Sequence, residues 1–403
     1  DAHGFLRQGY PGLPHINTTL RVPHDGAVEA NVLSIEIEEF HLGPVAPSKG
    51  SITRSASPQQ IPYRFDSFYE TDEWFPAENI TLGRPFILRG VRGVNVQFQP
   101  FQFNPATKIL RVARSLVVEI WSVDDMAAVH VKERGQPHGK AEFDGIYRDL
   151  FVNYMADESS SSRQIDEPGE LVIIAYDDFL DAVQPLAEWK IQKGIPTTVV
   201  ALSEIGSSSE EIKTFLRSKY ERRELTYVIL VGDASEMPVM WGTTDAASDP
   251  SYVMLEGDDF YPDAFISRIS ASTVEQVVAQ VNKILAYEKT PAGGDWYRKA
   301  LGIASDEGAD IEPDYLKDWQ RAEILREMLL EYTYEEVDQV YDPGAARAEV
   351  AGAINDGRSI VNYIGHGSGT NWATTGFGNS DAQLLDNGNR LPFIIDVSSL
   401  NGQ

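Results

Sequence analysis

Two segments near the end of the sequence place chemically versatile side chains directly after apolar stretches. Residues 359–364 lead into Gly-His-Gly at 365–367, and residues 392–397 lead into Ser398 and Ser399. Flanking glycines let the backbone turn sharply at His366 and approach a ligand closely. An imidazole, with an unperturbed pKa of about 6.5, can act as a general base. A small polar residue after a buried strand suits a nucleophile.

A third segment contributes a carboxylate. The apolar residues 300–304 are followed by Ser305, Asp306 and Glu307. An acid beside an imidazole fixes its tautomer and stabilises its charged form. Each of the three segments also has an ordinary interpretation, namely a loop histidine, a helix N-cap and a solvated acidic loop. Catalysis is therefore indicated only if His366, Ser399 and Glu307 come together.

The region after residue 171 alternates apolar strands with amphipathic helices. The predicted strands are 171–176, 197–202, 227–231, 265–269, 300–304, 359–364 and 392–397, and the predicted helices are 179–193, 209–220, 274–288 and 319–332. This alternation predicts an α/β domain with a mainly parallel sheet covered on both faces. Sites in such sheets lie at the carboxyl ends of the strands, where the three segments above are expected to meet.

The first part of the chain has a different pattern. Short apolar runs, separated by Gly and Pro, predict an antiparallel, β-sandwich-like domain over residues 1–158. The predicted strands there are 32–37, 85–91, 94–98, 109–112 and 116–121. Residues 159–170 begin with a run of serines and are expected to form an exposed linker and processing region, which leaves 171–403 as the second domain.

Composition excludes several classes of function. The 403 residues carry 34 Lys and Arg against 61 Asp and Glu, a net charge of −27, which disfavours binding to nucleic acid or anionic lipid. No apolar run reaches the ~18–20 residues of a membrane span. The sequence has no cysteine, so it contains no disulfide, thiolate metal site or cysteine nucleophile. Because no signal-peptide pattern follows Asp1, we expect the numbering to begin inside a processed or trimmed chain.

Five motifs in collinear order resemble the gingipain family of cysteine endopeptidases, and its arginine-specific branch in particular. They are LTYVILVGD at 225–233, ASDEG at 304–308, YDPG at 341–344, VNYIGHGS at 361–368 and LPFIIDV at 391–397. The resemblance implies a caspase-like fold for 171–403. It also implies that the β-rich region is a prodomain that inhibits the enzyme, and that the protein is secreted.

The resemblance also assigns roles to individual residues. It implies that His366 is the catalytic histidine, that Glu307 orients it, and that backbone amides near Gly367 and Ser399 form the oxyanion hole. Asp318 falls where arginine-specific members keep a carboxylate at the base of the S1 pocket, which would pair with a substrate guanidinium. The alternative for Asp318 is an exposed acid on a helix.

Two features depart from the family pattern. The family has its nucleophilic cysteine where this chain has Ser399, and a serine hydroxyl in a site shaped for sulfur is expected to be inactive. An engineered Cys→Ser change that keeps a self-processing zymogen intact is the simplest explanation; a naturally inactive homologue and a serine-type relative are the alternatives. The sequence also ends at Gln403, so we expect a truncated domain whose C-terminal remainder is a partner.

The sequence therefore predicts the zymogen of a secreted cysteine endopeptidase that cleaves proteins or peptides after a basic residue, with Arg favoured. Arg163 is the predicted processing site, with Arg134, Lys140 and Arg148 as alternatives. The competing hypothesis is a catalytically dead binding or adhesion protein that keeps the fold.

No cofactor is required by this chemistry. The acidic loop 256–259 and Asp263 offer oxygen ligands suited to calcium, although such clusters also arise by chance in so acidic a chain.

Overall fold

The computed structural model describes residues 2–4, 6–52, 56, 58–123, 140–155, 169–222, 225–242, 246–308 and 316–401. These residues form two compact units. The first comprises residues 14–42 and 73–284, and the second comprises 2–13, 43–72 and the chain from 285 onward. The predicted processing site Arg163 and its alternative Arg134 lie outside the described residues, as does most of the predicted linker.

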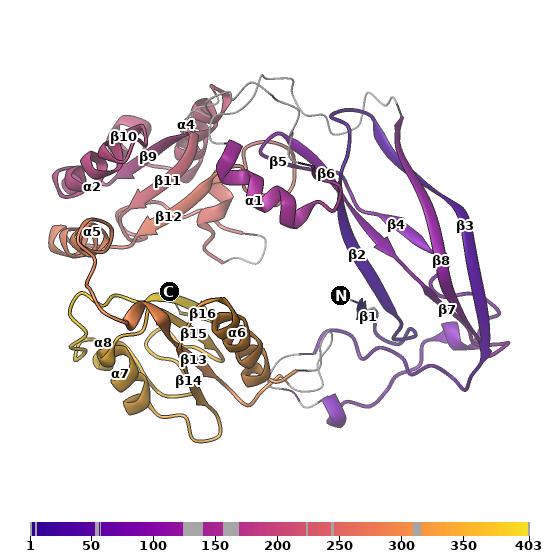
Figure 1. The fold of residues 1–403 in the computed structure, drawn as a ribbon. Coiled ribbons are helices and arrows are strands. Elements are labelled where there is room, and N and C mark those ends of the chain that lie inside the picture. The colour runs from indigo at the N-terminus through magenta and orange to yellow at the C-terminus, as the bar shows by residue number, and fades with distance from the viewer. Residues whose placement is uncertain are drawn as a thin grey trace. The chain divides into compact units, whose positions relative to one another are not determined.

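The β-rich part of the first unit contains two antiparallel sheets (Figure 1). Strand β6 (Val91–Phe98) pairs with β2 (Pro14–Arg21), β4 (Ile80–Leu82) and β5 (Phe86–Leu88). Strand β8 (Ile109–Val123) pairs with β3 (Ala27–His41) and β7 (Phe101–Asn104). Apolar side chains of both sheets pack together; the buried ones are Val22, Val94 and Val96, with Leu20, Val28, Ile80, Leu82, Phe98 and Ile120 around them. The predicted β-sandwich is confirmed.

Two strand boundaries differ from the prediction. The predicted strands 109–112 and 116–121 are one strand, because Ala113 and Ser115 between them pair with Ile37 and Glu36 of β3, with a register shift at this point. The predicted strand 85–91 is instead divided by a turn. Arg89 and Gly90 have φ angles of 43° and 76°, which reverse the chain between β5 and β6.

The first unit also contains a parallel sheet, with strand order β10-β9-β11-β12. Its strands are β9 (Glu170–Ala175), β10 (Thr197–Ala201), β11 (Leu225–Val231) and β12 (Phe265–Ile269). The helices of this unit are α1 (Lys140–Leu150), α2 (Leu180–Gln192), α3 (Leu202–Ile205), α4 (Ser209–Glu221) and the part of α5 (Val274–Lys289) up to residue 284. Arg148, an alternative processing site, lies in α1 and Lys140 is its first residue.

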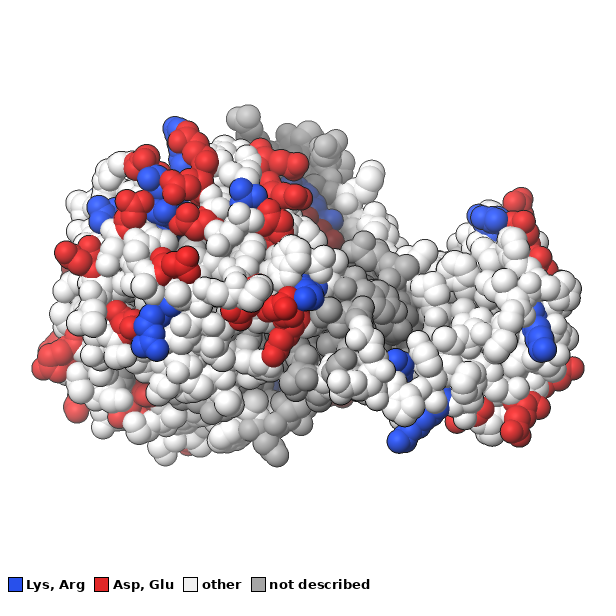
Figure 2. Space-filling model, turned by 90° about the horizontal axis from the view of Figure 1, so that it is seen from below, with Lys and Arg blue, Asp and Glu red and all other residues white. Residues whose placement is uncertain are grey.

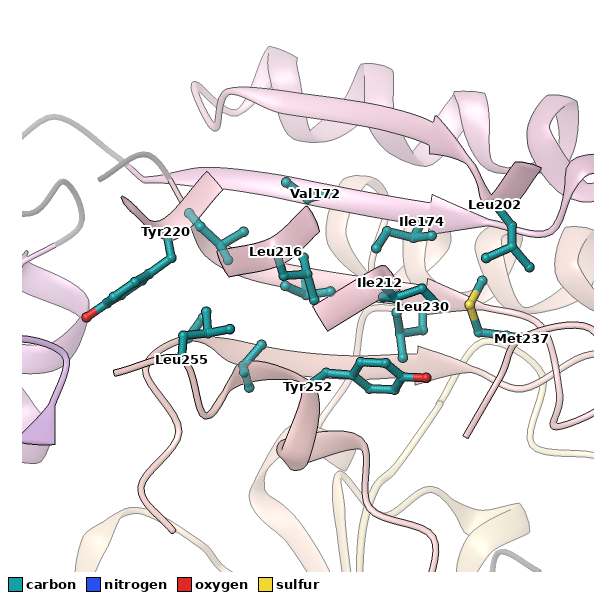
Figure 3. Packing of buried hydrophobic residues seen from close by; sticks show 14 residues of the cluster. Val172, Ile174, Leu202, Ile212, Leu216, Tyr220, Leu230, Met237, Tyr252 and Leu255 are labelled. Carbon is teal, nitrogen blue, oxygen red and sulfur yellow. The ribbon is translucent and has the colours of Figure 1, made fainter. Parts of the chain in front are cut away.

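Helix α4 shows how the sequence pattern builds this core. Its start is set by a capping box between Ser208 and Glu211, which satisfies backbone N–H groups at the helix end. Ile212, Leu216 and Tyr220 recur at a spacing of four and are all buried. Figure 3 shows them packed against strand residues that include Ile174 and Leu230.

The second unit is organised around another parallel sheet, with strand order β14-β13-β15-β16. Its strands are β13 (Lys299–Ala304), β14 (Glu336–Tyr341), β15 (Ile360–Ile364) and β16 (Phe393–Val397). The helices are α6 (Asp318–Tyr332), α7 (Arg347–Asp356) and α8 (Asn379–Ala382), and β1 (Ala2–Gly4) also belongs to this unit. Short 3₁₀ helices occur at Pro58–Gln60, Ser67–Glu70, Asp177–Phe179, Asp249–Val253 and Trp296–Arg298.

The predicted parallel pairing is confirmed, but the strands are divided between two sheets rather than joined in one. Strand β14 and helix α7 have no counterpart among the predicted elements. Strand β14 lies at a sheet edge and mixes polar with apolar residues without a regular alternation, and α7 contains Gly352 and few large apolar residues. Both patterns are weak, because neither element needs a continuous apolar surface.

The surface agrees with the acidic composition. Figure 2 shows basic side chains scattered singly among acidic ones on the visible face. Among the residues that the structure describes, no helix is both long enough and apolar enough to cross a membrane.

Candidate active site

The register of the second unit's sheet brings the three candidate segments to one edge. Ile364, the last residue of β15, is paired with Ala304 of β13 and with Val397 of β16. His366 and Ser399 therefore each follow two residues after a matched pair, and Glu307 follows three residues after Ala304. Because the strands are parallel, all three side chains emerge at the carboxyl edge of this sheet.

The imidazole of His366 contacts the carboxylate of Glu307. The Nε2 atom of His366 lies 2.7 Å from Oε2 of Glu307, and both side chains are about two-fifths exposed, at 42% and 41%. The backbone carbonyl of His366 accepts hydrogen bonds from the hydroxyl of Tyr363 at 2.5 Å and from the amide of Ala373 at 2.8 Å. The histidine is thus anchored through its backbone, and its Nδ1 is the nitrogen that Glu307 does not contact.

The Gly-His-Gly loop lies directly against the segment that holds Ser399. A Cβ atom at Gly367 would lie 2.5 Å from the carbonyl oxygen of Ser399 and 2.5 Å from Oδ1 of Asn401. Only glycine permits this approach, which places the Gly367 backbone beside that of the predicted nucleophile. Leu400, with φ at 65°, turns the chain immediately after Ser399.

We expect Gly367→Ala to lower the free energy of unfolding by about 1–3 kcal/mol, because the new methyl group overlaps the backbone of the 399–401 segment. Thermal and urea unfolding would measure the change. Gly369→Ala is the matched control, since a Cβ atom there meets nothing within 4 Å. Equal stability of the two variants would contradict the close approach.

Asp318 is fully buried at the start of α6, with 0% of its surface exposed. Its amide donates to the carbonyl of Glu307 at 2.8 Å. Its carboxylate accepts hydrogen bonds from the Ser305 hydroxyl at 2.5 Å and from Nη1 of Arg321 at 3.1 Å. The alternative of an exposed helix acid is therefore wrong. Asp318 lies beside the Glu307 loop as a buried carboxylate that already pairs with a guanidinium.

Asp396, which is not among the predicted site residues, supports the Ser399 segment. Its Oδ2 atom accepts hydrogen bonds from Nε1 of Trp372 at 3.0 Å and from Nδ2 of Asn401 at 2.7 Å. The available signal was an acid inside the otherwise apolar strand 392–397. A pocket of about 230 Å³ adjoins this network; its lining includes Ser368, Trp372, Phe377, Ile394, Asp396 and Asn401.

The acidic loop suggested for calcium lies in the first unit. Asp263 is fully buried, and its carboxylate accepts hydrogen bonds from the amides of Leu255, Glu256 and Arg89 at 2.7–2.8 Å. Burial raises the pKa of Asp263 to about 7, and the three amide donors oppose this rise. Asp259 likewise accepts from two backbone amides. Within the described residues, no group of three or more His, Asp or Glu side chains is arranged to hold a metal; calcium stays a prediction.

Comparisons with known proteins show the family to which the chain belongs. The profile of Peptidase family C25 matches residues 164–403, and that of its propeptide matches residues 1–161. Gingipain R2 of Porphyromonas gingivalis is 35% identical over 400 residues, which cover 98% of this chain and 54% of that protein. Lys-gingipain HG66 of the same organism is 24% identical over 95% of this chain and 23% of its own length. The chain thus spans about half the length of the gingipain R2 relatives, or less of the others.

Solved structures give the same result. The crystal structure of the Arg-specific cysteine proteinase gingipain R matches with a TM-score of 0.57 and 34% identity, over 59% of this chain and 56% of that one. A complex of the pro- and mature domains of RgpB from P. gingivalis matches with a TM-score of 0.55 and 34% identity, over 57% and 55% of the two chains. The resemblance to the gingipain family is confirmed: the chain belongs to peptidase family C25 and carries the family's propeptide ahead of its peptidase region.

Proposed function

We propose that this chain is the zymogen form of a secreted cysteine endopeptidase that cleaves proteins and peptides after a basic residue. The observation that carries the proposal is the contact between His366 and Glu307 at the sheet edge where β16 leads into position 399. A base held by an acid beside a nucleophile position is the arrangement that acyl transfer requires.

The mechanism needs a cysteine at position 399. A thiolate there attacks the scissile carbonyl carbon, and the carbonyl oxygen becomes an oxyanion held by backbone amides near Gly367 and residue 399. The protonated His366 then gives its proton to the leaving amine as the C–N bond breaks, which leaves a thioester. Water, deprotonated by His366, hydrolyses the thioester and restores the thiolate. None of these steps uses a metal or organic cofactor; a calcium ion at the acidic loop would be structural.

The buried carboxylate of Asp318 supports a preference for Arg. A guanidinium can pair with it through two parallel N–H···O bonds, whereas the ammonium of Lys is a point charge. Arg321 already donates to Oδ1 of Asp318, so a substrate guanidinium has to share or displace that contact. Arg preferred over Lys is therefore the proposed specificity.

We also propose that the peptidase region is held inactive until the propeptide region is released. With Ser399 the chain is expected to be inactive, and residues 1–161 are expected to act as the inhibitor, with release by cleavage near Arg163. The apolar side chains of β16 remain exposed, for example Phe393 at 68% and Ile394 at 46%. We expect further polypeptide of the peptidase to cover them.

A catalytically dead binding protein is the second candidate, and the observation that favours it is Ser399 itself. In that case the family fold would be kept for recognition of peptides rather than for hydrolysis. The two candidates differ only in whether a thiol at position 399 produces chemistry.

The deciding experiment is to prepare Ser399→Cys in the full chain and incubate it alone, then with peptides that end in Arg, Lys or a neutral residue. We expect self-cleavage between the two regions and turnover in the order Arg, Lys, neutral, abolished by a thiol-alkylating reagent. Ser398→Cys is the matched control, because its thiol lies one residue from the required position. A Ser399→Cys protein that is folded, with the exposed side chains of β16 covered, and is still inert would favour the binding protein, and a preference for Lys would remove the role of Asp318.

A further inference from the structure

A buried arginine of the propeptide region is held by residues of the peptidase region. Arg89 lies in the turn between β5 and β6 and is only 2% exposed. Its Nη1 atom donates to the carbonyl oxygens of Leu225 and Asp263, each at 2.8 Å. Its Nη2 atom donates to Oγ1 of Thr226 at 2.8 Å, and its backbone amide donates to Oδ1 of Asp263 at 2.8 Å. The acceptors come from β11 and from the loop before β12, both within the first unit.

The turn between β5 and β6 holds Arg89 in an unusual backbone conformation. Arg89 has a φ of 43°, a left-handed conformation that costs energy for a residue with a side chain. Gly90 follows with a φ of 76° and takes the next left-handed position without that cost. A strained backbone at a buried cation persists only when surrounding contacts compensate for it, and here those contacts belong to the peptidase region.

Aromatic packing surrounds the guanidinium. The Cζ atom of Arg89 lies 4.6 Å from the ring centroid of Phe143 in α1. Phe86 stacks on Tyr261 with ring centroids 3.8 Å apart, and Phe143 packs on Phe265 at 4.7 Å. Each of these two pairs joins one propeptide-region ring to one peptidase-region ring. A central desolvated arginine within a ring of aromatic contacts is the usual composition of a binding hot spot.

We propose that the hydrogen-bond acceptors of Leu225, Thr226 and Asp263 form an arginine-binding docking site of the peptidase region, and that Arg89 is its occupant in the zymogen. This site uses none of the catalytic side chains and lies in the other compact unit. It therefore supplies affinity between propeptide and peptidase regions without blocking the active site itself. The inference does not depend on the proposed peptidase activity.

A second arginine of the propeptide region pairs with the peptidase region in an exposed position. Arg84 pairs with Asp258 at 3.0 Å, but the two side chains are 64% and 89% exposed. An exposed ion pair contributes little, whereas a buried guanidinium with several acceptors is costly to remove. The two arginines, five residues apart in sequence, allow the docking site to be distinguished from general charge attraction.

The test uses the full chain with Ser399 kept, so that no self-cleavage occurs. A recognition sequence for a specific protease is inserted between residues 156 and 168, and the folded protein is cut there. Size-exclusion chromatography and a dilution series then measure the affinity between the two pieces. We expect the pieces to stay together, Arg89→Ala to weaken the affinity by about 10²–10³-fold, and Arg84→Ala to weaken it by less than about 5-fold.

Two further variants distinguish loss of the docking contact from misfolding of the propeptide region. Arg89→Lys keeps the charge but loses the planar fork, and we expect a loss of about 10-fold or more. Thr226→Val changes only the peptidase side and removes the acceptor of Nη2, with an expected loss of about 3–10-fold. Pieces that separate at once after cutting would overturn the proposal. So would equal affinities for folded Arg89→Ala, Arg89→Lys and Arg84→Ala.

Discussion

In the protein that carries cysteine at position 399, His366→Ala is expected to lower kcat/KM for an Arg-ending peptide on the order of 10³-fold or more. The imidazole serves twice, since it stabilises the thiolate as its counterion and then protonates the leaving amine. His366 is the one histidine between residues 139 and 403, so this stretch offers no second imidazole to take over. Steady-state hydrolysis of a chromogenic peptide measures the effect.

Controls separate this loss from a loss of structure. The backbone carbonyl of His366, not its side chain, holds the loop to Tyr363 and Ala373, so His366→Ala should unfold at nearly the wild-type temperature. Added imidazole should restore part of the activity by entering the space left by the side chain. Glu307→Gln should cost less, about 10–10²-fold, because it keeps a polar contact to Nε2 but removes the charge. A fully active His366→Ala enzyme would contradict the mechanism.

The second large effect concerns substrate selection. In the same cysteine-bearing protein, Asp318→Asn is expected to lower kcat/KM for Arg-ending peptides by about 10²–10³-fold. Asn has nearly the same shape and still accepts a hydrogen bond from Ser305, but it lacks the charge that pairs with a guanidinium. Turnover of a peptide that ends in a neutral residue should be almost unchanged, so the ratio of the two rates is the quantity to measure.

Asp306→Asn is the matched control for Asp318→Asn. Asp306 lies beside Glu307 on the same loop and pairs with Lys317, but its side chain is 45% exposed. Removal of this exposed carboxylate should leave the preference for Arg within about 5-fold of the parent enzyme. Equal losses for Arg-ending and neutral peptides in Asp318→Asn would show that the carboxylate supports the fold of the site rather than substrate selection.

Local sequence patterns determined which segments are strands and helices. The runs at 171–176, 227–231 and 300–304 are apolar without interruption, and the run at 359–364 contains only Ser359 and Asn362 as polar residues; each appears in the structure within one or two residues of its predicted position. The same runs indicated parallel pairing, because a strand buried on both faces needs apolar residues throughout. The candidate residues His366, Glu307 and Ser399 could be found in this way, since each follows such a run directly.

Only the tertiary structure decided how these elements combine. The division into two parallel sheets, the burial of Asp318 and the support of the Ser399 segment by Asp396 have no local signature. Arg89 is the clearest case: its turn falls inside a predicted strand, and its acceptor Asp263 is 174 residues away. Hydrophobic periodicity depends on near neighbours in the chain, and it therefore predicts individual helices and strands. The cost of burying a charge depends on the partners that folding brings from distant segments, and these partners decide where a charge is anchored.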